Sequence, residues 1–401
     1  MRIVIVGAGF AGMYAALSAA RLRDIQGVTP EALEIMLVSP EPTLVVRPRL
    51  YEAKPETVTA PLQDLLKAID VVYLQGSVVS IDTKSRALKV AVANQSERVV
   101  AYDRLVIAAG SRLFRPEIPG LEQYGFSVDQ LSDAVALDRH LHDLAKLPPS
   151  KNRDTVVVAG GGFTGIEVAT ELPARMRAIL GRDTNPRIVI VERNAAIAPD
   201  LGTAARPHIE DALQVLGVDP RTGVGVTSLD KSGVTLSSGE RIECATVIWA
   251  AGMRAAPLTA QIPAERDTSG RLLVDRELRV PSVNGVFATG DAAKALCDDK
   301  GTYALMSCQH ATRMGAFAGN NAAAELLGVP TKPYHQEAYV TCLDLGAAGA
   351  LFTRGWERKV EMVGEAAKKT KHEINTVWIY PPRANRAAAL AIADPEQVTK
   401  L

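Results

Sequence analysis

Residues 2–21 read RIVIVGAGFAGMYAALSAAR, and this stretch decides the fold. A short apolar run leads into a G-x-G-x-x-G turn at Gly7, Gly9 and Gly12, and an alanine-rich helical run follows. The first glycine makes the tight turn, the second lets the backbone approach a pyrophosphate, and the third lets the helix pack closely on the strand. Because the helix N-terminus then faces the phosphates, the stretch predicts a Rossmann-like dinucleotide-binding unit.

The same pattern recurs in the middle of the chain, where residues 155–172 read TVVVAGGGFTGIEVATEL. A single G-x-G-x-x-G is a weak signal. Two copies, each between an expected strand and an expected helix, indicate one chain that holds two dinucleotides. We therefore predict an α/β fold with two Rossmann-like dinucleotide-binding domains, and a flavin–nicotinamide oxidoreductase is the protein class that this arrangement favours.

Composition narrows the class of protein further. The chain has 401 residues, is 47% hydrophobic, and carries 45 Lys plus Arg against 45 Asp plus Glu. This length allows two to three domains with real cores, and the charge balance gives no reason to expect nucleic acid as a partner. The four cysteines indicate a reduced, cytoplasmic protein, and a first strand at residue 2 leaves no room for a signal peptide. Its apolar stretches are too short to predict stable membrane insertion.

Local patterns predict the remaining organisation of the chain. Alternating apolar runs over 71–74, 77–81, 87–92 and 98–102 resemble a small antiparallel meander. The other expected elements are strands over 34–38, 187–192 and 246–250 and helices over 131–144, 203–216 and 307–327. From residue 330 onward the pattern changes to short strand-like runs and a basic patch, which indicates a small C-terminal subdomain.

Two further motifs carry a family resemblance. Residues 103–111 read DRLVIAAGS and lead to Ile118-Pro119-Gly120, while residues 285–291 read GVFATGD. With both glycine turns, these motifs resemble the two-dinucleotide-binding-domain flavoproteins related to glutathione reductase. The resemblance implies a glutathione-reductase-like FAD/NAD(P) fold. It divides the chain into a discontinuous FAD-binding domain (1–120 and 254–330), an NAD(P)H-binding domain (121–253) and a C-terminal subdomain (331–401).

Within that family, the chain most resembles type II NADH dehydrogenases. Residues 246–255 (TVIWAAGMRA) and 48–53 (PRLYEA) are similar to their second glycine junction and to their segment under the flavin. Residues 308–313 (CQHATR) stand where those enzymes carry an Ala-Gln-x-Ala-x-Gln quinone motif, from which Cys308 and Arg313 depart. The tail over 383–401 is short, alanine-rich and without aromatic anchors, so we expect no membrane-lying helices of the kind that end those enzymes.

The resemblance implies that the first glycine turn holds FAD and that Asp291 hydrogen-bonds its ribityl chain. The usual acidic ribose partner at the end of the second strand is replaced by Ser39, with Glu41 nearby; either could bind the ribose or merely turn the chain. Arg47 is a candidate cation for a reduced flavin, or an ordinary surface arginine. The expected FAD-binding residues are Gly7, Gly9, Phe10, Ala11, Gly12, Ser39, Pro40, Arg47, Ala109, Gly110, Gly290, Asp291 and Gln309.

The second glycine turn is expected to hold the nicotinamide nucleotide. Glu192 closes the following strand, where a carboxylate binds the ribose diol and repels a 2′-phosphate. Arg193 follows directly and could tolerate that phosphate, so we expect NADH and keep NADPH as an open alternative. The expected residues of this site are Gly162, Phe163, Thr164, Gly165, Glu192 and Gly252.

The resemblance implies that hydride passes from NADH to the flavin and electrons then pass to a small acceptor. The catalytic candidates are Glu167, Gln309 and Arg313. Glu167 would lie between nicotinamide and flavin, or would simply complement the helix dipole. Gln309 and Arg313, four residues apart, share one helix face that could hydrogen-bond an acceptor carbonyl, or is an ordinary helix face.

Missing residues exclude related chemistries. No cysteine precedes Cys244, which excludes the disulfide reductases of this family, and His140 and His142 point to different helix faces, so no metal site is expected. The basic run Lys368–Lys371 is interpreted as a solvated face that could also dock an acidic ferredoxin.

We therefore predict an FAD-dependent NADH dehydrogenase that passes electrons to a quinone or a similar small acceptor. The alternatives are a ferredoxin or rubredoxin reductase, a flavin-dependent oxidoreductase for a specialised metabolite, and a redox-sensing binding protein. A homodimer stays open.

Overall fold

A parallel sheet near the N-terminus is built from segments far apart in the sequence. The computed structural model describes residues 1–93 and 96–397. The strands run in the order β21-β9-β1-β2-β5, and all neighbours are parallel. Their bounds are β1 (Arg2–Val6), β2 (Glu34–Ser39), β5 (Val72–Gln75), β9 (Arg104–Ile107) and β21 (Val286–Ala288). The buried apolar side chains of β1 and β2 are typical of a sheet that is covered on both faces.

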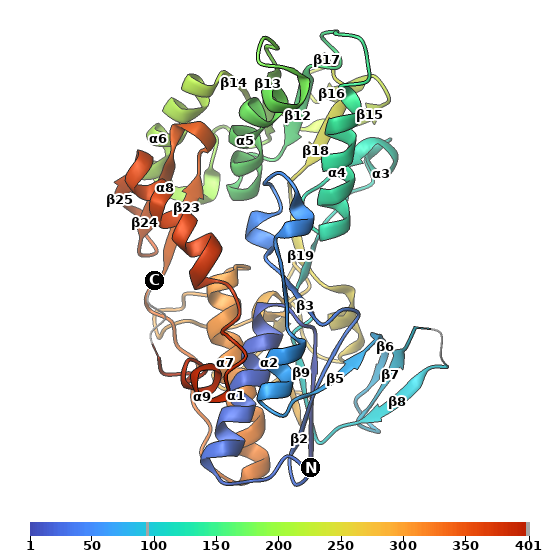
Figure 1. The fold of residues 1–401 in the computed structure, drawn as a ribbon, viewed down its shortest axis with the longest axis vertical. Coiled ribbons are helices and arrows are strands. Elements are labelled where there is room, and N and C mark those ends of the chain that lie inside the picture. The colour runs from blue at the N-terminus through green and yellow to red at the C-terminus, as the bar shows by residue number, and fades with distance from the viewer. Residues whose placement is uncertain (94–95, 398–401) are drawn as a thin grey trace.

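Two long helices pack together against this sheet (Figure 1). They are α1 (Phe10–Ile25), directly after β1, and α7 (Cys308–Leu327). A Cβ on Gly315 would lie 2.3 Å from the carbonyl oxygen of Ala11, and one on Gly319 would lie 2.0 Å from that of Ala15. Only glycine therefore permits this close approach, which fixes the start of α7 near the start of α1.

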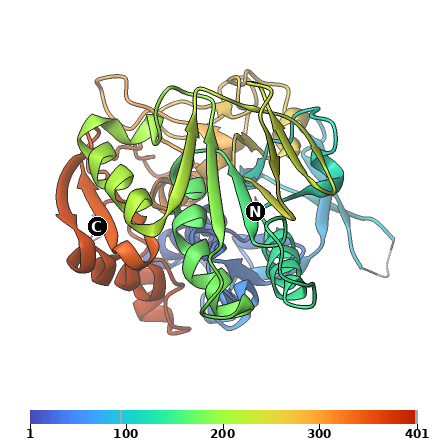
Figure 2. The same ribbon diagram turned by 90° about the horizontal axis from the view of Figure 1, so that it is seen from above.

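A second parallel sheet occupies the other half of the molecule, with strand order β11-β18-β12-β13-β14. Its strands are β11 (Gly125–Phe126), β12 (Thr155–Ala159), β13 (Arg187–Glu192), β14 (Val218–Thr222) and β18 (Thr246–Trp249). The helices α4 (Leu131–Leu144), α5 (Phe163–Leu180) and α6 (Gly202–Leu216) accompany it. Figure 2 shows this sheet from above, with the C-terminal strands on the α6 side.

A two-stranded ribbon connects the halves. β10 (Ser111–Leu113) pairs antiparallel with β19 (Met253–Ala255), so the chain leaves the first half and re-enters it side by side. This course agrees with a discontinuous first domain and a nucleotide-binding insertion, although the exact boundaries stay predictions.

The expected meander is smaller than the sequence pattern indicated. It consists of β6 (Ser77–Asp82), β7 (Ala87–Ala91) and β8 (Arg98–Ala101). The run over 71–74 is not part of it: β5 pairs in parallel with β2, with Val72 opposite Met36. That part of the prediction was wrong, because alternation shows a half-exposed strand but not which neighbour it pairs with.

The C-terminal region forms a small three-stranded sheet followed by helical segments. Its elements are β23 (Val340–Asp344), β24 (Ala350–Arg354), β25 (Lys359–Val363), α8 (Gly364–Glu373), a π-helical turn (Ile374–Trp378) and α9 (Arg386–Ala391). The end of the chain returns to the first half, where Arg21 pairs with Asp394 at 2.6 Å. The remaining short elements are β3 (Thr43–Val45), β4 (Thr59–Pro61), α2 (Gln63–Ala68), α3 (Leu121–Tyr124), β15 (Val226–Asp230), β16 (Gly233–Leu236), β17 (Arg241–Glu243), β20 (Leu272–Leu273) and β22 (Ala293–Lys294).

Among residues 1–93 and 96–397, no helix combines the length and apolarity needed to cross a bilayer. The same residues contain no group of three His, Cys, Asp or Glu placed to hold a metal ion.

Candidate functional site

The first glycine turn has the geometry that a pyrophosphate requires. Gly7 has φ +110°, and a Cβ there would lie 2.3 Å from the oxygen of Ala108; a Cβ on Gly12 would lie 1.8 Å from the oxygen of Gly7. Around Gly9, by contrast, nothing lies within 4 Å of the Cβ position, and α1 has no side-chain cap. Since the N–H groups of Phe10 and the following residues begin the helix without such a cap, this turn suits an anionic phosphate group.

The second turn repeats this geometry. Gly160 has φ +123°, and a Cβ on Gly165 would lie 1.8 Å from the oxygen of Gly160. The space around Gly162 is open, and the N-terminus of α5 likewise lacks a side-chain cap. Phe163 and Thr164 form the accessible first residues of this helix. The chain therefore contains two matched dinucleotide turns, as two cofactors require.

Asp291 lies beside the first turn, as expected for a flavin ligand. It directly follows Gly290, which has φ +61° and whose Cβ position lies 2.8 Å from the Cβ of Ala11. The Asp291 carboxylate accepts a hydrogen bond from the Ser111 hydroxyl at 2.6 Å, and Arg47 Nη1 lies 3.8 Å away. Burial raises the pKa of Asp291, and the Arg47 guanidinium opposes that rise.

Several residues expected at the flavin site are thus brought together: Ala11, Arg47, Gly290 and Asp291. Ser111 joins them, and the sequence reasoning missed it as a site residue. Its signal was its place at the end of the DRLVIAAGS motif.

Two other glycines mark the ribbon that joins the halves. Gly110 has φ +69° and directly precedes β10, and Gly252 has φ +82° and directly precedes β19. The carbonyl of Gly110 accepts from the N–H of Ala256, and that of Gly252 accepts from the N–H of Phe114. Ala109 and both glycines therefore lie where the chain crosses between the two nucleotide-binding halves.

At the end of β2, Ser39 has a local structural partner. Its buried hydroxyl donates to the carbonyl of Glu41 at 2.7 Å, and Tyr73 donates to the Ser39 carbonyl at 2.8 Å. Pro40 and Glu41 are exposed. These contacts support the interpretation that Ser39 shapes the turn, and its ribose contact stays a prediction.

Glu192 lies at the end of β13, directly against the second glycine turn. One carboxylate oxygen accepts from the N–H of Gly161 at 2.8 Å, and the other accepts from the backbone and side chain of Asn194 at 2.8 and 2.6 Å. The carboxylate is therefore fixed at the edge of the turn, whereas Arg193 points to solvent.

Glu167 is paired with a residue from the other end of the chain. Its Oε1 accepts from Lys371 Nζ at 2.8 Å and from the N–H of Asp344 at 3.1 Å, and both charged side chains are almost completely buried. Burial raises the pKa of Glu167 to about 7, and Lys371 opposes the rise. The Lys371 ammonium also lies 5.7 Å from the centre of the Phe163 ring, next to the second glycine turn.

This pair corrects the interpretation of the basic run. Lys371 is buried rather than solvated, and Lys368 donates to Asp344 Oδ1 at 2.5 Å. Of the three lysines only Lys369 is exposed. The signal in the sequence was the spacing of Ala367 and Lys371, which share the buried face of α8.

Strand β23 of the C-terminal subdomain contacts both nucleotide-binding halves. At its start, the N–H of Val340 donates to Gln309 Oε1 at 3.3 Å; at its end, Asp344 contacts Glu167. The Asp344 carboxylate also accepts from the Tyr51 hydroxyl at 3.0 Å. The C-terminal subdomain therefore contacts both nucleotide-binding halves.

Gln309 and Arg313 do not form a shared open face. Arg313 is buried, and its guanidinium donates to the carbonyls of His335 and Gln397 at 2.8 and 2.9 Å. Gln309 and Arg313 are four residues apart and lie on one side of α7. However, residues after 330 cover the Arg313 side chain. We therefore do not propose that Arg313 contacts the electron acceptor.

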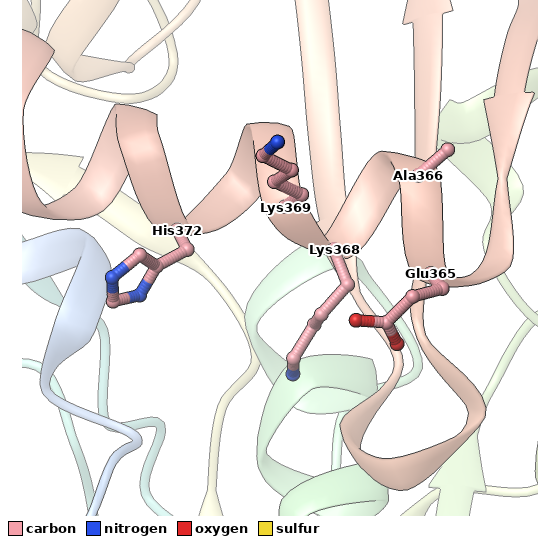
Figure 3. A pocket seen from close by; sticks show the side chains of 5 residues that line it. All are labelled: Glu365, Ala366, Lys368, Lys369 and His372. Atoms are coloured by element: carbon pink, nitrogen blue, oxygen red, sulfur yellow. The ribbon is translucent and has the colours of Figure 1, made fainter.

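A shallow depression lies on α8 (Figure 3), with a volume of about 450 Å³. It is lined by Glu365, Ala366, Lys368, Lys369 and His372. In Figure 3 the Lys368 side chain points away from that of Lys369. Its ammonium donates to Asp344 Oδ1 at the end of β23.

All four cysteines are free thiols, and three of them are buried. Burial raises the pKa of Cys244 and Cys342 to about 12 and that of Cys297 and Cys308 to about 11. Burial therefore favours the protonated thiol at each of these cysteines.

The part of the chain that contains both glycine turns matches a known protein family. The model of the family described as pyridine nucleotide-disulphide oxidoreductase matches residues 1–315. The chain belongs to this family. It is 46% identical over 397 residues to an NADH dehydrogenase-like protein of Mycobacterium tuberculosis, covering 98% of each chain. It is 29% identical to a demethylphylloquinone reductase of Synechocystis, covering 88% of this chain and 86% of that protein.

Solved structures share the fold. The NDH2 of Plasmodium falciparum in complex with NADH aligns with a TM-score of 0.80 at 16% identity, over 98% of this chain and 97% of that one. The sulfide:quinone oxidoreductase of Aquifex aeolicus aligns with a TM-score of 0.78 at 18% identity, over 97% and 92%. The predicted family, the α/β fold and the assignment as a flavin- and nicotinamide-dependent oxidoreductase are confirmed.

Proposed function

We propose that this chain is an FAD-dependent NADH dehydrogenase of the type II kind, which passes electrons to a quinone or a similar small acceptor. The observation that carries the proposal is the pair of matched glycine turns, each opening on an uncapped helix N-terminus. The relatives named NADH dehydrogenase-like protein, demethylphylloquinone reductase and type II NADH:quinone oxidoreductase support the same activity.

The first half offers the contacts that FAD would need. The N-terminus of α1, beyond Gly9, would receive the pyrophosphate, and Asp291 would bind the ribityl chain. Arg47 beside Asp291 supplies a positive charge. When bound, FAD supplies the capacity to accept a hydride and release electrons, and the protein supplies orientation and electrostatics.

The second half would bind the nicotinamide nucleotide at Gly162 and the N-terminus of α5. We propose NADH rather than NADPH as the donor. The fixed Glu192 carboxylate would accept hydrogen bonds from a ribose diol, whereas a 2′-phosphate would meet like charge. Replacing Glu192 by a neutral residue and comparing kcat/KM for NADH and NADPH therefore tests the proposed coenzyme.

The Glu167–Lys371 pair would serve the chemistry between the two nucleotides. A carboxyl group with a pKa of about 7 can hold or release a proton near neutral pH, as reduction of a quinone to a quinol requires. Lys371 keeps the charged form accessible despite burial. Gln309, partly exposed at the start of α7, stays our candidate for hydrogen-bonding the acceptor.

Anaerobic stopped-flow spectroscopy tests the proposal directly. NADH is expected to bleach the flavin absorbance rapidly, NADPH more slowly, and a short-chain quinone is expected to restore the absorbance. Purified protein that retains no flavin after incubation with FAD and removal of the unbound FAD would contradict the proposal. Flavin reduction without reoxidation by any quinone would contradict the acceptor assignment alone.

The structure gives little support to a carrier-protein reductase. A basic docking face was its main argument, but Lys371 and Lys368 bind internal carboxylates. Turnover with a ferredoxin that falls steeply with ionic strength would restore this alternative. Weak turnover with every acceptor would instead favour the redox-sensing alternative. We further propose a cytoplasmic location, which the four free cysteines support.

A further inference from the structure

An ion pair joins the two halves of the chain next to the flavin-binding residues. Asp129 lies between β11 and α4, in the nicotinamide-nucleotide half, and its side chain is only 7% exposed. Arg47 comes from the flavin half. Its Nη2 donates to Asp129 Oδ1, and its Nε donates to the Asp129 carbonyl at 3.1 Å. Arg47 therefore holds Asp129 by the side chain and the backbone together.

The remaining carboxylate oxygen of Asp129 is also occupied. It accepts from the N–H of Leu113 at 3.0 Å, within the connecting ribbon, and from the Gln130 amide at 2.6 Å. Because both oxygens have donors, the carboxylate is fixed in one orientation, and the fork of the arginine is fixed with it.

The other side of Arg47 faces the flavin site. Its Nη1 donates to the Ser111 hydroxyl at 3.2 Å and lies 3.8 Å from Asp291 Oδ2. One guanidinium thus lies between two carboxylates, Asp129 behind it and Asp291 in front. Without that cation, two carboxylates that are only 7% and 14% exposed would face the same site.

We propose that Asp129 is a positioning residue for the flavin site: it fixes the Arg47 guanidinium against Ser111 and Asp291 and ties the nucleotide half to the flavin half. This inference rests on the proposed function, since it requires FAD to bind beside Asp291. It assigns to the segment before α4 a role in the redox properties of a cofactor held by the other half.

Charge rescue gives the sharpest test. Arg47→Met removes the counter-charge of Asp129, whose side chain is only 7% exposed, so we expect the dissociation constant of FAD to rise about tenfold or more. The midpoint potential of the bound flavin should become more negative, because the reduced flavin loses a nearby cation. Adding Asp129→Asn to this variant removes the stranded charge. We expect the double variant to recover at least half of the change in the logarithm of the FAD dissociation constant and at least half of the shift in midpoint potential.

A matched control lies four residues away. Asp133 accepts from the Ser127 hydroxyl at 2.7 Å and makes no contact with Arg47. Asp133→Asn added to Arg47→Met should therefore recover neither change. If Arg47→Met does not fold, the near-isosteric Asp129→Asn alone should still bind FAD and shift its potential to a more positive value, whereas Asp133→Asn should leave the potential unchanged.

The outcomes separate the two claims. Wild-type protein that binds no FAD would contradict the proposed function and this inference with it. FAD-loaded wild-type protein in which Asp129→Asn neither rescues Arg47→Met nor moves the potential would overturn the inference alone. Equal effects of Asp129→Asn and Asp133→Asn would overturn it too.

Discussion

The ammonium group of Lys371 lies 2.8 Å from the carboxylate of Glu167, although 204 residues separate the two in the sequence. Glu167 belongs to the helix that follows the second glycine turn, and Lys371 belongs to the C-terminal subdomain. The helix that opens at the second glycine turn therefore receives the partner of its buried carboxylate from a third part of the chain.

Replacing Lys371 should be costly. Lys371→Met leaves Glu167 buried without its cation, and breaking a buried pair in this way typically costs about 3–5 kcal/mol. We expect urea unfolding to show a loss of this order. Lys369→Met, on the exposed side of α8, is the matched control and should leave the unfolding free energy within about 0.5 kcal/mol of wild type.

The pH dependence of stability should reveal Glu167. Its pKa is raised from 4.5 to about 7 in the folded chain, so the folded state binds the proton more tightly than the unfolded state. The Glu167 contribution to stability is then present below pH 4.5 and is lost as the pH rises toward 7, by about 1–3 kcal/mol. Unfolding of wild type and Glu167→Gln between pH 5 and 8 checks this; identical slopes would show that Glu167 does not titrate as described.

The glycines of the first turn should respond differently to alanine. At Gly12 a Cβ would lie 1.8 Å from the oxygen of Gly7, so Gly12→Ala should destabilise the fold by at least about 2 kcal/mol. At Gly9 the space is open, so Gly9→Ala should fold normally but bind FAD more weakly. Thermal unfolding of FAD-free protein and fluorescence titration with FAD separate the two effects. A folding defect in Gly9→Ala would contradict the assignment of that space to a cofactor.

Glu192 should set the choice of coenzyme. Glu192→Gln removes the negative charge while keeping an acceptor near Gly161, so discrimination against NADPH should fall about tenfold or more in kcat/KM. Arg193→Ala serves as the comparison and should leave the rate with NADH unchanged. Unaltered NADH preference in Glu192→Gln would show that selectivity arises elsewhere.

Arg313→Gln restores the quinone motif in sequence but should not restore function. Glutamine cannot reach both carbonyls that the guanidinium holds, so we expect a stability loss of about 1–3 kcal/mol with little change in the rate of flavin reoxidation by quinone. A large gain in that rate, with stability intact, would return Arg313 to the acceptor site.

Local patterns were sufficient to predict the nucleotide-binding core. Both glycine turns, the Asp291 motif and the helix over 131–144 appear as expected, because each has a recognisable local sequence pattern. Close packing of Gly12 on Gly7 is a consequence of the turn itself.

Contacts between distant segments could not be predicted in this way. The burial of Lys371 depends on Glu167, and that of Arg313 depends on carbonyls of His335 and Gln397. The same limit explains the misplaced strand over 71–74, whose partner β2 lies earlier in the chain. Charge and spacing indicate a helix face, but only the tertiary fold shows whether solvent or another segment covers it.

The position of Lys371 also orders events during protein synthesis. A ribosome that has joined the first 330 residues has already made both glycine turns, but β23 and the lysine that pairs with Glu167 are still to be made. A product that ends before α8 would contain both glycine turns but would leave Glu167 without its cation. The Glu167–Lys371 pair can therefore form only after both glycine turns and α8 have been synthesised.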